Sequence, residues 1–383
     1  MLFSFKFCIA GALVGLLATA QLLDASCKSW EAPSGAKAIY ILNNGDSNSV
    51  AAIPIAHNGT LFGGVTRATG GNGGSTVKAT GGFNGPDALG SQSSLTVVDS
   101  VSKTDPTDLK LVNKPIAVPG QFPVTVAASS KNSLVCVGTT GAQAGVSCAS
   151  YTPGGLGSMS PLTVFSLNQT TPPSRPLNGV AHTFFSDDED RLITTVKGDP
   201  TTNNTGFVSV LPVENFYSYP GAHDTRSSLN GTAVLFGAAV IPGTSTFLAT
   251  DASFGAAILQ VNSFTNEVLI SSKQTIPGQK ATCWAAYSKQ RGSVFVTDPL
   301  VNRLVELSAL DSQVITTIDL TNGDSGLIDL KVSGRYVYAL SPGNGTTPAA
   351  VTVVDSFVGK QIQHFLVGGL GASKSSQGVA VLE

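Results

Sequence analysis

A short strand-like segment recurs along the chain, and it constrains the fold more than any other feature. Each copy is a run of apolar, β-branched or aromatic residues that ends on a polar residue. The copies are YILNN, VCVGT, ITTVK, FLATD, VFVTD and VYALS, which end at Asn44, Thr139, Lys197, Asp251, Asp298 and Ser341. The steps between successive ends after Thr139 are 58, 54, 47 and 43 residues. Several short strands in each period of roughly forty to fifty residues are typical of a β-propeller.

Six copies are visible, and the first step is about two periods long, so the pattern predicts one further unit. The fold class expected is all-β: a seven-bladed β-propeller with four-stranded antiparallel blades. A last apolar run at 378–382 is expected to pair into blade one and close the ring, which removes a free edge. The predicted blades are 38–65, 95–118, 123–167, 180–213, 232–276, 281–320 and 327–367, with long loops at 66–92 and 215–228.

The N-terminus has the pattern of a secretory signal peptide. Lys6 precedes the apolar run 7–17, and Ala18-Thr19-Ala20 resembles a cleavage site. A retained membrane anchor is the alternative, but the run is shorter than the ~20 residues that a span needs. We therefore expect a signal peptide at 1–20, a single propeller domain at 21–383, and a secreted, vesicular or cell-surface location with no membrane span after cleavage.

The composition narrows the possible partners. The formal net charge is −2 and only 12% of residues are charged. A nucleic-acid-binding protein needs a basic face, so no nucleic-acid partner is expected. A few polar groups that converge in an apolar recess at the mouth of a propeller favour a small-molecule substrate instead.

Four cysteines follow the signal peptide. Cys136 and Cys148 lie on either side of the turn 141–144, where hairpin pairing would set them opposite each other. Secretion permits oxidation, so the sequence predicts a disulfide between them. Cys27 and Cys283 remain as a second predicted pair. Five N-x-S/T sequons are expected to carry glycans: Asn58, Asn168, Asn203, Asn230 and Asn344.

No metal or cofactor site is expected. The chain has no CxxC motif, and its histidines are far from its cysteines in sequence. Neither a phosphate-binding glycine loop nor a Ser-His-Asp spacing is evident.

Candidate site residues come from the ends of strands that face one mouth of the propeller. The predicted catalytic residues are His182, Lys197, Asp251 and Asp298. The predicted substrate-binding residues are Trp284, Phe185, Phe254, Tyr338, Thr232 and Ser341. Each has an alternative interpretation: the two aspartates could cap turns, His182 could satisfy backbone groups, Lys197 could be solvated and Trp284 could pack between blades.

Several stretches are similar to those of a known family. The most telling are 122–150, 184–210, TDASFGAAIL, KATCWAAYS and YALSPGNGTT. The chain resembles secreted fungal 3-carboxymuconate cyclase-like proteins of the lactonase propeller superfamily. It departs from the lactonizing members, because Ala181, Ala252 and Pro299 occupy the positions that correspond to the family's His, Glu and Arg.

The resemblance extends to secreted propellers that act as hetero-Diels–Alderases. Such enzymes join a tropolone-derived o-quinone methide to a macrocyclic terpene of the humulene type without a cofactor. This resemblance implies a cyclase of fungal secondary metabolism with an apolar terpene and a tropolone-like ring as substrates. A lactonase or carboxymuconate cyclase-like enzyme and a non-catalytic secreted surface glycoprotein are the two alternatives.

Overall fold

The computed structural model describes residues 37–45, 47–71, 73–75, 89–91, 94–100, 105–216 and 223–383. All of these residues lie within one compact unit, 34–383. The predicted signal peptide and Cys27 therefore lie outside the described residues. Within the described ranges, no helix is long and apolar enough to span a membrane.

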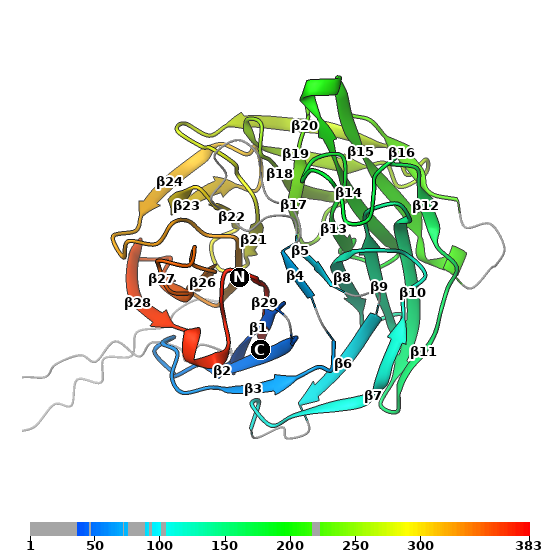
Figure 1. Cartoon of the computed structure of the whole chain (residues 1–383). Coiled ribbons are helices and arrows are strands. Elements are labelled where there is room, and N and C mark those ends of the chain that lie inside the picture. Colours follow the sequence, from blue (N-terminus) through cyan, green and yellow to red (C-terminus); the bar gives the residue numbers. More distant parts are fainter. Residues whose placement is uncertain are drawn as a thin grey trace, which may run out of the picture. The chain divides into compact units, whose positions relative to one another are not determined.

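Six antiparallel sheets of four or five strands make up most of the described residues (Figure 1). The first contains β29 (Ser376–Leu382), β1 (Ala38–Asn43), β2 (Ser49–Pro54) and β3 (Val65–Ala68). The second contains β8 (Pro123–Ser129), β9 (Leu134–Thr139), β10 (Ala144–Thr152), β11 (Gly155–Met159) and β12 (Thr163–Phe165). The third contains β13 (Val180–Phe185), β14 (Arg191–Asp199), β15 (Asn204–Pro212) and β16 (Thr225–Ser227).

The remaining three sheets follow in chain order. The fourth contains β17 (Leu235–Val240), β18 (Thr246–Asp251), β19 (Gly255–Val261) and β20 (Val268–Thr275). The fifth contains β21 (Ala285–Ser288), β22 (Ser293–Asp298), β23 (Val301–Ser308) and β24 (Val314–Asp319). The sixth contains β25 (Asp329–Ser333), β26 (Tyr336–Ser341), β27 (Ala350–Asp355) and β28 (Lys360–Leu366). Short 3-10 turns occur at Pro200–Thr202, Val213–Phe216 and Gly368–Leu370.

The fold is an all-β propeller with antiparallel, mostly four-stranded blades, as the repeat predicted, but it has six blades instead of seven. The expected second blade forms only a two-stranded sheet, β6 (Ser94–Ser100) with β7 (Leu109–Ala117). A second small sheet, β4 (Gly73–Ser75) with β5 (Leu89–Ser91), lies in the predicted loop 66–92. The stretch 66–92 is rich in glycine, and glycine weakens strands because it has no side chain to pack. The interval from Asn44 to Thr139, which is about two repeat periods long, therefore does not contain two complete blades.

Apolar side chains pack between neighbouring sheets and hold the blades together. One such cluster joins the third and fourth sheets and includes Phe184, Ile193, Leu235, Phe247 and Leu259. Four further clusters join other pairs of sheets in the same way. The first strands of successive sheets are also in contact, from β8 to β13, β17, β21, β25 and β29. The candidate site lies beside these inner strands, with His182 on β13 and Phe236 on β17.

The C-terminal strand β29 is the innermost strand of the first sheet. It pairs antiparallel with β1, from Ala38↔Leu382 to Asn43↔Ser376. The backbone N–H of Val379 also donates to Oδ2 of Asp329 on β25, at 2.6 Å. Asp329 thus connects the C-terminal strand to the inner strand of the preceding blade.

The Cys136–Cys148 disulfide is confirmed. The two residues are direct partners on β9 and β10, and both are buried. Of the second predicted pair, Cys27 lies outside the described residues, and Cys283 is a free thiol in the structure. Its backbone is fixed in the interior, since Cys283 N–H donates to Thr297 O and Cys283 O accepts from Gly237 N–H.

The five predicted glycan sites all lie on exposed turns or loops: Asn58, Asn168, Asn203, Asn230 and Asn344. At two of them, Asn58 and Asn344, the side-chain oxygen accepts a hydrogen bond from the sequon threonine hydroxyl at 2.7 Å. All five side chains are thus accessible to a modifying enzyme.

Candidate functional site around His182, Lys197 and Trp284

His182 lies on the inner strand β13 and faces the neighbouring strand β17. Its Nδ1 accepts a hydrogen bond from the Ala238 backbone N–H at 3.1 Å. Burial, with a smaller contribution from the Lys331 charge, lowers the pKa of His182 to about 3. The imidazole is therefore neutral near pH 7, and because Nδ1 is an acceptor, the ring proton is on Nε2.

Lys197 projects from the same face of the sheet as His182. His182 is the cross-strand partner of Thr195, and Lys197 is two residues beyond Thr195 on β14. Since side chains alternate along a strand, all three point toward β17. The Lys197 Nζ lies 5.1 Å from the centre of the Phe236 ring. Burial lowers the pKa of Lys197 to about 8, although its interaction with Cys283 acts in the opposite direction.

Trp284 completes an aromatic surface between His182 and Phe236. Its ring centre is 4.7 Å from that of His182 and 5.6 Å from that of Phe236, edge to face in both cases. We call His182, Lys197, Phe236, Cys283 and Trp284 the axial cluster. Such edge-to-face contacts favour a fixed ring arrangement.

Gly237 allows this close packing. A Cβ atom at this position would lie 2.7 Å from the Cys283 carbonyl oxygen and 2.8 Å from Trp284. Its backbone N–H donates to that carbonyl oxygen at 3.0 Å. The sequence LFGAAV therefore places Phe236 beside Trp284 and leaves no side chain between the two strands.

The Cys283 thiol is also part of the cluster. Burial raises its pKa, and the carboxylates of Asp329 and Asp298 add to this effect. Lys197 opposes it, which indicates that the amine and the thiol lie near each other. Cys283 is thus protonated near pH 7 and is not a thiolate nucleophile.

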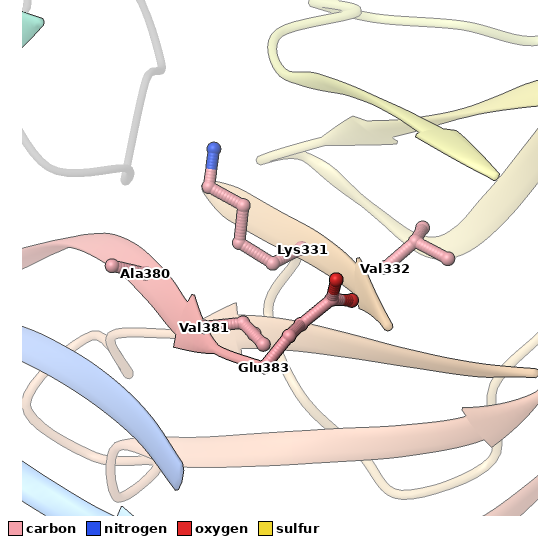
Figure 2. Close-up of a pocket in the computed structure, with 5 residues that line it drawn as sticks. All are labelled: Lys331, Val332, Ala380, Val381 and Glu383. Atoms are coloured by element: carbon pink, nitrogen blue, oxygen red, sulfur yellow. The ribbon is translucent and has the colours of Figure 1, made fainter. Parts of the chain in front are cut away.

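A pocket of about 460 Å³ lies between the inner strands β25 and β29 (Figure 2). It is lined by Lys331, Val332, Ala380, Val381 and Glu383. Figure 2 shows the Lys331 side chain extending into the open space, with the Glu383 carboxylate on the same side of the pocket. Lys331 also lowers the pKa of His182, so the pocket and the axial cluster share an electrostatic environment. The volume suits a small organic molecule.

Asp251 and Asp298 make structural hydrogen bonds. Asp251 accepts from the backbone N–H groups of Ala233, Val234 and Ser253. Asp298 accepts from those of Lys280, Ala281 and Leu300. Both carboxylates are buried, and each fixes the segment that leads into the inner strand of its own blade. This geometry corresponds to the alternative interpretation, in which they cap turns.

The remaining predicted residues lie apart from the axial cluster. Tyr338 is fully buried and donates to Gly59 O at 3.0 Å. Phe185 packs in the core between the second and third sheets. The Phe254 ring lies under the Lys273 ammonium, at 3.9 Å. Thr232 donates to Leu229 O, and Ser341 is buried at the end of β26.

The structure thus brings together three of the ten predicted catalytic and substrate-binding residues: His182, Lys197 and Trp284. It adds Phe236, Cys283 and Lys331. Lys331 could have been predicted from the sequence, because a lysine in the middle of an inner strand is unusual. The places of Phe236 and Cys283 in the site could not be predicted from the sequence, because the contact between β17 and β21 depends on how two blades pack.

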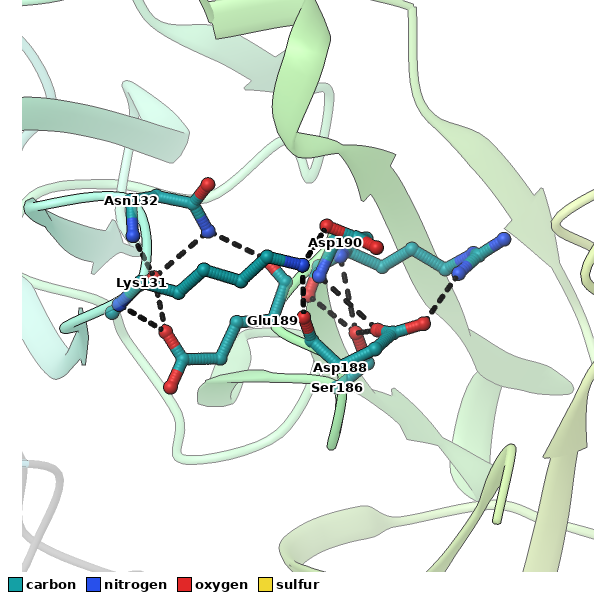
Figure 3. Close-up of polar contacts among 8 residues, drawn as sticks. Lys131, Asn132, Ser186, Asp188, Glu189 and Asp190 are labelled. Atoms are coloured by element: carbon teal, nitrogen blue, oxygen red, sulfur yellow. Dashed lines mark hydrogen bonds and ion pairs between the residues drawn. The ribbon is translucent and has the colours of Figure 1, made fainter. Parts of the chain in front are cut away.

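The turn that carries much of the family resemblance, between β13 and β14, binds the neighbouring blade (Figure 3). Lys131 Nζ contacts Asp190 Oδ1 at 2.6 Å and donates to Asp188 O at 2.8 Å. Glu189 accepts from the Ser129 hydroxyl and from the Lys131 backbone N–H. This acidic turn therefore has a structural role between the second and third sheets.

In the part of the chain that the structure describes, no three His, Cys, Asp or Glu side chains converge as metal ligands. No known protein-family profile matches the chain, and no curated protein matches it. Among solved structures, the fold is similar to a crystal structure of a nidogen/laminin complex, with a TM-score of 0.52 and 10% identity. The match covers 90% of this chain and 98% of the other. At this identity the likeness supports the propeller fold alone.

Proposed function

We propose that this protein is a cofactor-independent cyclase that performs a hetero-Diels–Alder reaction in the axial cluster. The proposed substrates are a tropolone-derived o-quinone methide and a humulene-type terpene. The observation that carries the proposal is the neutral His182, which has its proton on Nε2 and whose ring contacts Trp284, which in turn contacts Phe236. An apolar surface with one oriented donor matches the needs of this reaction.

The reaction needs orientation more than it needs a nucleophile. Two bonds form together between the quinone methide and an alkene of the terpene, and no group leaves. Holding both partners in one geometry therefore supplies much of the rate enhancement. A hydrogen bond from His182 Nε2–H to the quinone methide oxygen would stabilise the negative charge that develops there. Lys197, as an ammonium, would supply a proton when water leaves a hydroxymethyl precursor.

We also propose a secreted, glycosylated protein of fungal type in which the pairing of β29 with β1 closes the ring of blades. The exposed sequons and the buried disulfide support the secretory assignment. A free edge at the first blade would otherwise invite pairing with other chains.

A second candidate function is a non-catalytic binding glycoprotein. One observation favours it: the hairpin tips at Phe264 and Leu310 are 94% and 90% exposed. An apolar side chain that is almost fully exposed is available to contact a partner protein. A lactonase is less well supported, because Ala181, Ala252 and Pro299 provide no charged group.

The test is a product assay with purified protein. The hydroxymethyl tropolone precursor and humulene are incubated with and without the protein, and the adducts are separated by chiral chromatography. We expect faster adduct formation and one dominant stereoisomer. Unchanged rate and isomer ratio at stoichiometric protein would reject the cyclase. Lactone hydrolysis in a parallel assay would favour the lactonase, and activity in neither assay would favour the binding glycoprotein.

A further inference from the structure

The Lys197 amine is unusual among the lysines of this protein. In the described ranges, its Nζ has no hydrogen-bond acceptor and no carboxylate partner, and its nearest aromatic contact is the Phe236 ring at 5.1 Å. By contrast, Lys131 is paired with Asp190 at 2.6 Å. Lys197 is half-buried, and an amine in apolar surroundings without an anion beside it loses its proton more readily.

We propose that Lys197 forms a Schiff base with an aldehyde or ketone of aromatic or apolar character that enters the axial cluster. The inference goes beyond the proposed cyclisation, because it requires only the amine and its aromatic surroundings. The ligand would be a carbonyl compound whose ring packs against Phe236 and Trp284.

The step balances without an oxidant or a reductant. The Lys197 nitrogen attacks the carbonyl carbon, a proton moves from nitrogen to oxygen, and a carbinolamine forms. Water then leaves, and a carbon–nitrogen double bond remains. Lysine amines in apolar surroundings are activated for this chemistry because they lose their proton more readily.

The titration of Lys197 supports this role. Its pKa of about 8 makes the neutral amine about two orders of magnitude more abundant at pH 7 than in a lysine with the ordinary value of 10.5. The other titratable groups around the cluster are Cys283, His182, Asp298, Asp329 and Lys331. His182 and Cys283 are neutral near pH 7. The carboxylate oxygens of Asp298 and Asp329 accept hydrogen bonds from backbone N–H groups.

The experiment traps the Schiff base as a stable amine. The full-length folded protein is incubated with benzaldehyde and sodium cyanoborohydride at pH 7, and the benzylated lysines are mapped by peptide mass spectrometry. We expect Lys197 to be labelled roughly tenfold faster than Lys289 and Lys360, which are exposed. Part of the gain in free amine is offset, because a less basic nucleophile attacks more slowly.

Two variants make the result specific. Lys197→Arg should abolish the fast labelling, and the matched variant Lys374→Arg, at an exposed lysine outside the candidate site, should leave it unchanged. Labelling at Lys197 no faster than at Lys289 and Lys360 in the wild-type protein would overturn the proposal, whether or not Lys197→Arg folds. Fast labelling that maps to Lys331 and not to Lys197 would assign the chemistry to the pocket amine and overturn the proposal. Because labelling is read independently of adduct formation, it can fail while the cyclase assay succeeds, and the reverse also holds.

Discussion

The backbone N–H of Ala238 on β17 donates a hydrogen bond to Nδ1 of His182 on β13, over 3.1 Å. This bond joins two blades and fixes which nitrogen of the imidazole carries the proton. It also opposes protonation, because an imidazolium has no acceptor at Nδ1. The neutral ring can therefore donate its Nε2–H to a ligand. Because the ring is neutral when folded, the free energy of unfolding should depend on pH.

Protein stability should depend on pH through His182. Its pKa is about 3 when folded, against 6.5 for the ordinary side chain. Above pH 6.5 the ring is neutral in both states, so its contribution is fully present. As the pH falls below 6.5, only the unfolded chain takes up the proton, and the free energy of unfolding should fall by up to about 1.4 kcal/mol per pH unit.

Urea denaturation at pH 7 and pH 4.5 checks this expectation. The stability advantage of the wild type over His182→Gln should shrink by about 2 kcal/mol between these pH values. His223→Gln, at an exposed histidine, is the matched control and should show the wild-type pH dependence. Identical pH dependence in His182→Gln and wild type would contradict a neutral buried imidazole.

Gly237→Ala should disrupt the axial cluster. The added methyl group would lie within 2.8 Å of the backbone of Cys283 and Trp284, which cannot move without shifting β21. We expect a loss of about 1–3 kcal/mol in unfolding free energy and a changed tryptophan emission spectrum. Gly369→Ala is the control, since a Cβ there meets nothing within 4 Å. Equal stability of the two variants would show that the strands do not approach so closely.

Asp298→Asn separates a structural role from a catalytic one. The carboxylate accepts three backbone hydrogen bonds at 2.7 to 2.9 Å, and an amide cannot accept all of them. A destabilisation of about 1–3 kcal/mol is expected in denaturant titrations, with the adduct rate of the folded protein unchanged. Asp319→Asn, at an exposed residue of β24, should be neutral. A stable Asp298→Asn variant that lacks activity would restore Asp298 as a catalytic residue.

The Cys136–Cys148 disulfide should stabilise the second sheet. Replacing both cysteines by alanine should reduce the free energy of unfolding by about 2–4 kcal/mol, because the unfolded chain is no longer cross-linked. Non-reducing peptide mapping should find these two residues joined and Cys283 free. A Cys27–Cys283 peptide in that map would contradict the free thiol.

The repeat predicted the blades well where the strands alternate clearly. The segments ending at Asp251 and Asp298 became β18 and β22, in the expected four-stranded sheets. The count of seven was wrong because the 95-residue first step and the strand-like runs at 95–99 and 109–118 suggested one more blade, whereas these runs form only a two-stranded sheet. The glycine-rich stretch 66–92 before them gives no apolar pattern for an inner strand.

The candidate site was predictable only in part. His182 and Lys197 belong to paired strands of one blade, so their common face follows from strand register. Phe236 and Cys283 come from the next two blades, and their positions depend on how the blades pack. The two aspartates looked catalytic because their sequence position near the mouth does not reveal that backbone N–H groups occupy their oxygens.

The most direct test of the account is the rate and stereoselectivity of adduct formation in variants of the axial cluster, each first shown to be folded. His182→Ala should slow the reaction by roughly 10²–10³, the usual effect of one positioned donor or acid–base group, and Lys197→Ala should slow it by a similar factor when the precursor must lose water. Trp284→Ala should give the isomer mixture of the uncatalysed reaction before the total yield falls. Phe254→Ala, outside the cluster, should give the same dominant isomer as the parent protein. If folded His182→Ala, Lys197→Ala and Trp284→Ala proteins all retain the parent rate and selectivity, the axial cluster is not the site of the chemistry.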